Sequence, residues 1–292
     1  MPDRQQASVL HQLRNLASLM HLGNGIASGF GAVIGYFLTR QRYGDSVDWG
    51  VALAVFAVTA CISSAGFIIN DIRDLDIDRI NRPDRPLPAN LFSLRQAWVI
   101  LLLFTVGGIV LSAIINLTSL LVVVFLCVLL AGYSLYLKPR FLVGHIAIAL
   151  AGALLLPYGG IAAGNIVPTI YVVPIAFTAF LGREILKTLP DVAGDAAHQV
   201  TNLATRLGVR TAASAAFVCI AGAGVLLAVL PVFWQMNGLY FPTLLLIVYP
   251  VMVYLLVLIS NYTSAMNQAI RLSKLVFLLV LLPITIGSFI MI

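Results

Sequence analysis

Long runs of apolar residues, separated by short polar segments, make up almost the whole chain of 292 residues. A helix needs roughly 20 apolar residues to cross the hydrocarbon core of a bilayer. Runs of about this length predict membrane-spanning helices over nine ranges, namely 19–39, 49–70, 97–115, 117–137, 141–162, 168–190, 211–232, 240–260 and 275–292. The runs are too continuous for barrel strands, which alternate at every second position. The pattern therefore predicts an all-α integral membrane protein, folded as a single transmembrane domain over residues 1–292.

The composition agrees with this pattern and excludes a water-soluble globular domain. Hydrophobic residues make up 61% of the chain and charged residues only 10%. A typical soluble domain contains about 25% charged residues. We therefore expect the lipid bilayer to be the main surrounding of this chain, and we expect no nucleic acid among its partners.

The basic residues are distributed unequally between the two sides of the predicted bundle. With nine spans, the N-terminal tail and every second loop lie on one side. All 17 Lys and Arg residues except Arg40 and Arg42 fall there. Because cytoplasmic loops carry an excess of Lys and Arg, the cell membrane is the expected location, with the N-terminus and these loops in the cytoplasm. Such an excess would also attract anionic head groups or a polyphosphate.

Five of the eleven acidic residues are crowded into one polar segment, NDIRDLDIDRINRPDRPLP, which follows the second predicted span. If the helix continues there, Asn70, Asp74 and Asp78 recur every four residues and share one face. Asp71 then lies on the flank of this face, and Asp76 points away from it. Stacked carboxylates destabilise a helix unless a cation lies between them. Hard oxygen ligands suit Mg²⁺, so the segment is a candidate magnesium site.

A second polar stretch, GREILKTLPDVAGD, ends the sixth predicted span on the same predicted side of the membrane. Arg183, Lys187, Asp191 and Asp195 follow one another at intervals of four residues and form one stripe. Ionisable groups within a span are costly, and by default they mark functional sites. We interpret the stripe as a second set of metal and phosphate ligands. The structural alternative is a ladder of ion pairs in which Lys187 bonds Asp191.

Taken together, the two polar segments favour metal-dependent chemistry on a diphosphate. Carboxylates would hold Mg²⁺ ions that bridge the diphosphate, and nearby cations, among them Arg79, Arg82 and Arg85, would bind the remaining phosphate oxygens. A diphosphate held in this way becomes a better leaving group, because the charge that develops on it is stabilised where it forms.

Three motifs resemble the signatures of the UbiA superfamily of intramembrane prenyltransferases. They are Asn70-Asp71-x-x-Asp74-x-x-x-Asp78 with the Arg-Pro pairs that follow it, Asp191-x-x-Gly194-Asp195 with Arg183, Glu184 and Lys187 before it, and Tyr133-Ser134-x-x-x-Lys138. The resemblance implies a bundle of about nine helices around a central cavity that opens to lipid. It also implies Mg²⁺-dependent ionisation of a prenyl diphosphate, whose allylic cation is then captured by an acceptor.

The resemblance further implies roles for individual residues. The implied metal ligands are Asn70, Asp71, Asp74, Asp78, Asp191 and Asp195. Asp74, Asp78, Asp191 and Asp195 are the implied catalytic residues among them. Contacts to the diphosphate or the acceptor are expected from Asn24, Arg79, Tyr133, Lys138, His145, Arg183 and Lys187.

The first predicted span resembles the first helix of the archaeal digeranylgeranylglyceryl phosphate synthases, a group within this superfamily. Asn24 and Ala32-Val33-x-x-Gly35 carry this resemblance, although His21-Leu22 stands where that group usually has Arg-Pro. It implies transfer of a geranylgeranyl group to the hydroxyl of geranylgeranylglyceryl phosphate in ether-lipid synthesis.

Two other functions stay open. One is transfer to an aromatic acceptor, such as 4-hydroxybenzoate or a similar phenol, for quinone synthesis. The other, from a non-enzyme class, is a cation transporter. Transporter sites lie near the middle of the bilayer at broken helices, whereas both polar segments here lie at the ends of predicted spans.

Overall fold

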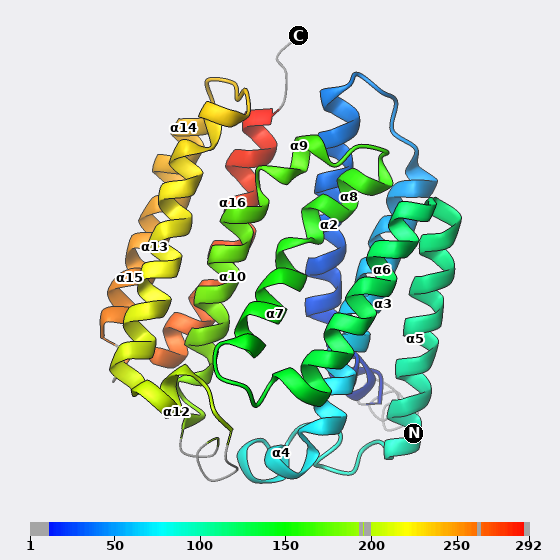
Figure 1. Cartoon of the computed structure of the whole chain (residues 1–292), viewed down its shortest axis with the longest axis vertical. Coiled ribbons are helices and arrows are strands. Elements are labelled where there is room, and N and C mark those ends of the chain that lie inside the picture. Colours follow the sequence, from blue (N-terminus) through cyan, green and yellow to red (C-terminus); the bar gives the residue numbers. More distant parts are fainter. Residues whose placement is uncertain (1–11, 193–194, 196–199, 262–263, 289–292) are drawn as a thin grey trace, which may run out of the picture. The chain divides into compact units, whose positions relative to one another are not determined.

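The computed structural model describes residues 12–192, 195, 200–261 and 264–288, and none of these residues forms a β-strand. The predicted all-α fold is confirmed. The helical elements, drawn in Figure 1, are α2 (Leu22–Arg42), α3 (Trp49–Arg73), α4 (Leu75–Asn81), α5 (Leu94–Ile115), α6 (Leu117–Gly132), η1 (Tyr133–Leu137), α7 (Val143–Ala153), α8 (Leu155–Ala162), α9 (Val167–Ile170), α10 (Val173–Thr188), α12 (Leu203–Leu207), α13 (Val209–Phe233), α14 (Tyr240–Thr243), η2 (Leu244–Val248), α15 (Tyr249–Ser260) and α16 (Met266–Ser288).

Nine stretches of the described chain are long and apolar enough to cross a bilayer, and each is one helix or a run of consecutive helical elements. The prediction of nine spans is therefore confirmed. Eight of the nine predicted ranges agree with the observed spans to within three residues at either end.

The prediction is wrong for the start of the ninth span, because α16 begins at Met266 rather than at residue 275. Arg271 and Lys274 interrupt the apolar run and suggested a later start. In the structure both are exposed, whereas Ala269 and Ser273 on the other side of the helix are fully buried. A helix that buries only one face does not need a continuous apolar run.

The chain divides into two compact units. The first consists of Met1–Phe30 and Trp49–Leu135. Its core is formed by buried side chains of α3 and α5, including Ile68 and Leu101, together with Leu87 from the proline-rich loop that follows α4. Because Leu87 is almost fully buried, it anchors this loop to the core of its unit.

The second unit consists of Gly31–Asp48 and Tyr136–Ile292. Within it, the second half of α2 crosses α8 so closely that no side chain fits between them. A Cβ atom on Gly159 would overlap the carbonyl oxygen of Ala32, and one on Gly35 would overlap that of Leu156. Glycine at these two positions is what allows the two backbones to touch.

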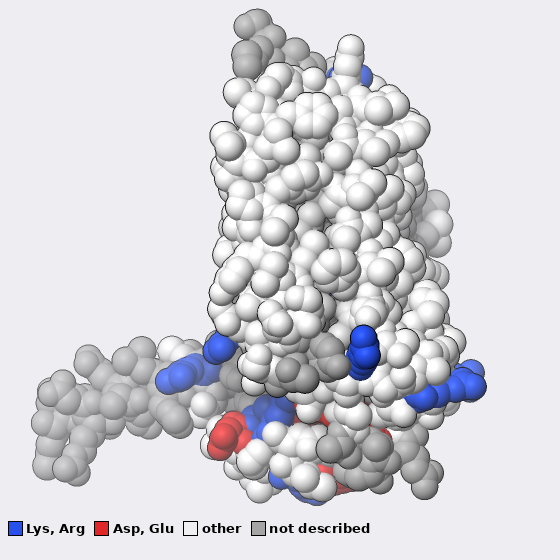
Figure 2. Space-filling model, turned by 90° about the vertical axis from the view of Figure 1, so that its left-hand side faces the viewer, with Lys and Arg blue, Asp and Glu red and all other residues white. Residues whose placement is uncertain are grey.

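Most of the described surface on the face shown in Figure 2 carries no charged side chain. The exposed side chains of α13 include Val218, Val225 and Val232. An apolar surface of this extent would promote aggregation in water, but it suits contact with lipid tails. Together with the nine spans, it shows that the chain is a multi-pass membrane protein.

Candidate active site

The acidic segment after α3 keeps its helical register across a short break. Asp74 lies between the end of α3 and the start of α4, with φ −88° and ψ 2°. Its backbone N–H still donates to Asn70 O at 2.9 Å, and the N–H of Asp78 donates to Asp74 O at 2.8 Å. The four-residue spacing survives, and Asn70 Nδ2 donates to Asp74 Oδ2 at 2.7 Å. Asn70 and Asp74 therefore share a face, as predicted.

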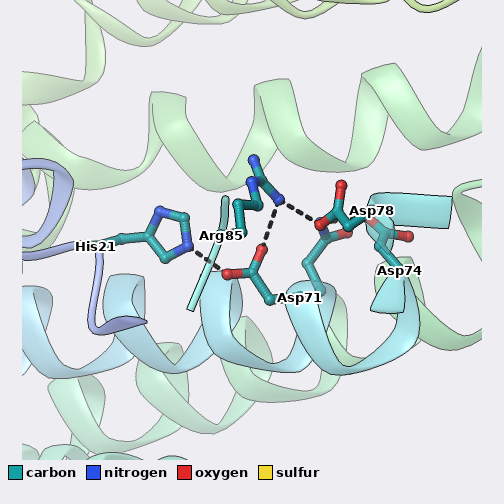
Figure 3. A network of polar contacts seen from close by, with 6 residues as sticks. His21, Asp71, Asp74, Asp78 and Arg85 are labelled. Atoms are coloured by element: carbon teal, nitrogen blue, oxygen red, sulfur yellow. Dashed lines mark hydrogen bonds and ion pairs between the residues drawn. The ribbon is translucent and has the colours of Figure 1, made fainter. Parts of the chain in front are cut away.

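Asp71 and Asp78 form a pair of carboxylates, with Arg85 between them (Figure 3). Arg85 Nη1 donates to Asp71 Oδ1 at 3.0 Å and to Asp78 Oδ2 at 2.6 Å. Both aspartates are buried, each with 5% of its surface exposed. Asp71, which we expected on the flank of the acidic face, is thus at the centre of the network. The guanidinium of Arg85 supplies the cation that these crowded carboxylates require.

His21 contacts the remaining oxygen of Asp71 and belongs to the same network (Figure 3). Its Nε2 lies 2.7 Å from Asp71 Oδ2, and its ring stacks on Phe67 with 4.8 Å between the ring centroids. The backbone of His21 has φ +48° and separates α2 from the helical residues 12–19. A positive φ is uncommon for a residue with a side chain. The only sequence signal for His21 is that it replaces the Arg of an expected Arg-Pro pair.

The pKa of Asp78, which lies on α4 outside the spans, is raised above its ordinary value. Burial is the main cause, the charges of Asp74 and Asp71 add to it, and Arg85 partly offsets it. A carboxylate whose folded-state pKa is raised makes folding less favourable at neutral pH. This cost disappears as the pH falls through the raised pKa toward the ordinary value near 4.

We therefore expect Asp78→Asn to raise the unfolding temperature of the metal-free protein at pH 7, and we expect this gain to shrink as the pH is lowered toward 4. The measurement is thermal unfolding in detergent with a chelator over this pH range. Asp76→Asn is the matched control, because the Asp76 side chain is 88% exposed, and it should change nothing at any pH. A lower unfolding temperature for Asp78→Asn at pH 7 would mean that its pairing with Arg85 outweighs the cost of burial.

Arg79, an expected phosphate contact, lies on the exposed side of α4 in this structure. Its Nη1 bonds Asp76 Oδ1 at 2.9 Å. Asp76 points away from the acidic face, as predicted. Neither residue takes part in the bonds that join Asp71, Asp78 and Arg85.

The polar stretch of α10, in the second unit, is organised by Glu184, which is buried with 7% of its surface exposed. Lys187 Nζ donates to both carboxylate oxygens of Glu184, at 2.9 and 2.8 Å, and Arg183 Nη1 donates to Glu184 Oε1 at 3.3 Å. Among the contacts of the described residues, Lys187 therefore bonds Glu184, and not Asp191 as in the structural alternative. A carboxylate three residues before a lysine can be reached within one helix, whereas α10 ends before Asp191.

Other expected site residues of the second unit lie around this pair or in the loops that follow. His145, on α7, interacts electrostatically with Glu184 and Lys187, and its Nε2 is buried without a hydrogen-bond partner among the described residues. Asp195 Oδ2 accepts a bond of 2.7 Å from Asn202 Nδ2. The N–H of Thr201 donates to the carbonyl oxygen of Pro139 at 3.3 Å. Pro139 follows Lys138, and Thr201 follows Asp195 by six residues, so this bond links the loop after Lys138 to the loop after Asp195.

The remaining predicted residues lie in helical elements of the described chain. Asn24 is in the first turn of α2, and its N–H donates to His21 O at 2.8 Å. Tyr133 is the first residue of the π-helical segment η1, which ends just before Lys138. Gly194, a member of the second motif, lies outside the described residues.

The oxygen donors of the first unit fit Mg²⁺ in their chemistry, although the side chains are not arranged around an ion. No group of three or more His, Cys, Asp or Glu in the described part of the chain is placed to hold a metal. However, Asn70 Oδ1 is a buried acceptor without a hydrogen-bond partner there, and Asn70 lies beside the carboxylate of Asp74. Carboxylate and carbonyl oxygens are the ligands that Mg²⁺ prefers. Asn70, Asp71, Asp74 and Asp78 are therefore the residues of this unit that would hold it.

Comparison with known proteins places these motifs in a wider group. Residues 28–281 match the profile of the UbiA prenyltransferase family. A digeranylgeranylglyceryl phosphate synthase from Methanoculleus marisnigri is 38% identical over 203 residues, which cover 68% of this chain and 71% of the relative.

Two solved structures have a similar fold. One, described as a digeranylgeranylglyceryl phosphate synthase in membranes, is 26% identical, with a TM-score of 0.74 and coverage of 96% of this chain and 99% of that chain. The other, a UbiA homolog from Archaeoglobus fulgidus bound to GPP and Mg²⁺, is 20% identical, with a TM-score of 0.72 and coverage of 92% and 99%. The second likeness shows the fold alone.

Proposed function

The chain belongs to the UbiA prenyltransferase family, and from this premise we propose that it transfers a geranylgeranyl group from its diphosphate to the hydroxyl of geranylgeranylglyceryl phosphate. The observation that carries this choice of acceptor is the 38% identity with a relative named digeranylgeranylglyceryl phosphate synthase. A structure so described also covers 96% of this chain. The product would be an ether lipid precursor with two prenyl chains.

We assign the acidic residues of the first unit to the metal. Asn70, Asp71, Asp74 and Asp78 would hold Mg²⁺, as the motifs that resemble the family's signatures imply, and their oxygen donors suit this ion. When bound, Mg²⁺ would neutralise charge that develops on the departing diphosphate. The corresponding roles of Asp191 and Asp195 in the second unit remain part of the proposal.

We assign the cations of the second unit to the diphosphate. Arg183 and Lys187 together carry two positive charges against the single charge of Glu184, so the group has a surplus of one positive charge for an anion. The side chain of Lys187 is 38% exposed, unlike that of Glu184, so its ammonium can take a further partner. Lys138 completes this set of cations, and Tyr133, in the first unit, is a further proposed substrate contact.

The transfer itself exchanges one carbon–oxygen bond for another. The bond between the allylic carbon and the diphosphate breaks, the acceptor hydroxyl oxygen forms the new ether bond, and the hydroxyl proton is released. An allylic cation reacts readily with water, so the surrounding apolar helices must keep water away from it. His145, with its buried ring nitrogen, is the residue that we propose lies close to the acceptor.

The test is the mass of the product. The purified protein, given geranylgeranyl diphosphate and Mg²⁺, should convert geranylgeranylglyceryl phosphate to digeranylgeranylglyceryl phosphate, and chelation of the metal should stop the reaction. Parallel reactions with 4-hydroxybenzoate test the aromatic acceptor. A prenylated phenol with no ether product would overturn the proposed acceptor but leave the prenyl transfer intact.

We also propose that the loops with the basic excess face the cytoplasm, as the distribution of Lys and Arg predicts. Single cysteines at the exposed positions Arg140 and Leu207, in a chain whose three natural cysteines are replaced, should be protected from an impermeant maleimide in intact cells. A cysteine at the exposed Asp45, on the opposite side of the predicted bundle, should be labelled. Labelling at Arg140 with protection at Asp45 would reverse the orientation.

A further inference from the structure

We propose that Arg85 is the resident counter-ion of the Asp71–Asp78 pair and yields these carboxylates to the metal when diphosphate binds, so that metal and diphosphate bind cooperatively. This inference rests on the proposed function, because it assumes that a metal and a diphosphate meet at this segment. It adds a role for Arg85 that precedes the reaction.

The geometry of the network shows that Arg85 occupies the place of a point cation. A single nitrogen, Nη1, donates to both Asp71 and Asp78, at 3.0 and 2.6 Å. The two carboxylates are seven residues apart and both buried, and Figure 3 shows them turned toward the same guanidinium. A metal ion that used these oxygens would compete with Arg85 for the same lone pairs.

The rest of the network would hold its place when Arg85 leaves. His21 Nε2 lies 2.7 Å from the other oxygen of Asp71, and the His21 ring stacks on Phe67. Asp71 itself is within α3, and Asp78 is within α4. The carboxylate of Asp71 is therefore held by a contact that does not depend on Arg85, and the backbone of Asp78 is held by α4.

Arg85 is carried by a fixed loop and has a partly accessible side chain. Its N–H donates to Arg82 O, and its carbonyl oxygen accepts from the N–H of Ala89. Two residues further on, Leu87 is buried in the core of the unit. The side chain of Arg85 is 26% exposed, so it can change its partner while the backbone stays in place.

Replacing Arg85 by a metal ion at the two carboxylates is unfavourable when the metal binds alone and favourable when diphosphate binds as well. Metal alone must displace a guanidinium from two charge-assisted hydrogen bonds and leave it without an anion. A diphosphate offers Arg85 phosphate oxygens that suit its forked donors. Because coupling between two ligands is reciprocal, each ligand then raises the affinity of the protein for the other.

The experiment measures Mg²⁺ binding to the full chain in detergent by calorimetry, with and without inorganic diphosphate. A metal buffer sets the concentration of free Mg²⁺ at each step, so that chelation by diphosphate in solution does not contribute. For the unchanged protein we expect diphosphate to tighten Mg²⁺ binding at least tenfold. Arg85→Met should bind Mg²⁺ alone at least fivefold more tightly, and the effect of diphosphate should fall below threefold.

Arg95→Met is the matched control, because Arg95 is an exposed cation of the same unit, in the first turn of α5, and has no assigned role in the site. It should behave like the unchanged protein. If Arg85→Met does not fold, Arg85→Gln keeps a donor for the carboxylates without the charge and should show the same changes. Unchanged Mg²⁺ affinity in the folded Arg85 variant, or coupling that persists in full, would overturn the inference.

The binding experiment on Arg85 and the product test of the proposed function can fail independently of each other. Inorganic diphosphate has no prenyl group, so the binding experiment does not depend on the acceptor. A protein that shows the coupling but makes no ether product overturns the proposed acceptor alone. A protein that makes the product without the coupling overturns the role of Arg85 alone.

Discussion

Asp74→Asn is expected to reduce the turnover of prenyl transfer about 100-fold to 1000-fold, the range found when one group that stabilises developing charge is removed. Asp74 lies at the break between α3 and α4, and its carboxylate accepts from Asn70 at 2.7 Å. The substitution keeps the size of the side chain and removes only its charge. An amide at position 74 can still bond Asn70, so the fold should survive while the metal loses a ligand.

Three measurements together test this expectation. Turnover is followed by product mass, folding by the unfolding temperature, and metal dependence by titration with Mg²⁺. Asp76→Asn, in the same segment but exposed, should keep full turnover. If Asp74→Asn retained turnover that still required Mg²⁺, Asp74 would be excluded as an essential metal ligand.

Glu184→Leu should have the largest effect on stability. The change removes the carboxylate that bonds both Arg183 and Lys187 and leaves these two cations inside a span without this counter-ion. Loss of one partner of a buried ion pair costs about 3–5 kcal/mol. Because Lys187 is partly exposed, we expect the lower end of this range, about 3 kcal/mol. The measurement is the unfolding temperature in detergent without ligand.

The double variant Glu184→Leu with Lys187→Met separates folding from binding. It removes one cation along with its counter-ion, so it should recover part of the lost stability. It should still bind a non-hydrolysable prenyl diphosphate analogue at least tenfold more weakly than the unchanged protein, a loss of about 1.4 kcal/mol or more. Lys187→Met alone should show the same weak binding. Native affinity in these variants would show that Lys187 serves only the fold.

The spans were predictable because a membrane imposes a simple requirement on sequence. Each crossing needs about 20 apolar residues, and eight of the nine ranges followed from that rule. The start of α16 did not, because a helix outside the hydrocarbon core can carry Arg271 and Lys274 on its exposed face. In the site, the shared face of Asn70 and Asp74 was also predictable, since it depends only on helical spacing.

Two kinds of contact could not be predicted from the sequence. Some depend on the path of the backbone between distant residues, and others depend on which of two possible partners a side chain bonds. His21 reaches Asp71, 50 positions away, from a left-handed backbone conformation that no turn residue signals. Arg85 reaches Asp71 from a loop whose course depends on the burial of Leu87. Glu184 was visible only as a neighbour of the predicted cations. Both Glu184 and Asp191 lie within helical reach of Lys187, and spacing alone does not choose between them.

The close crossing of α2 and α8 sets a limit for anyone who wishes to make this protein more robust for crystallisation or industrial use. Replacing helical glycines by alanine is a common route to stabilisation, and each exchange contributes about 0.4–1 kcal/mol where the site is compatible. Gly107 and Gly132 qualify, because a Cβ there would meet no atom within 4 Å. Gly35 and Gly159 do not, since the first added carbon would separate the two helices. A library that randomised all glycines equally would therefore lose stable members at these two positions.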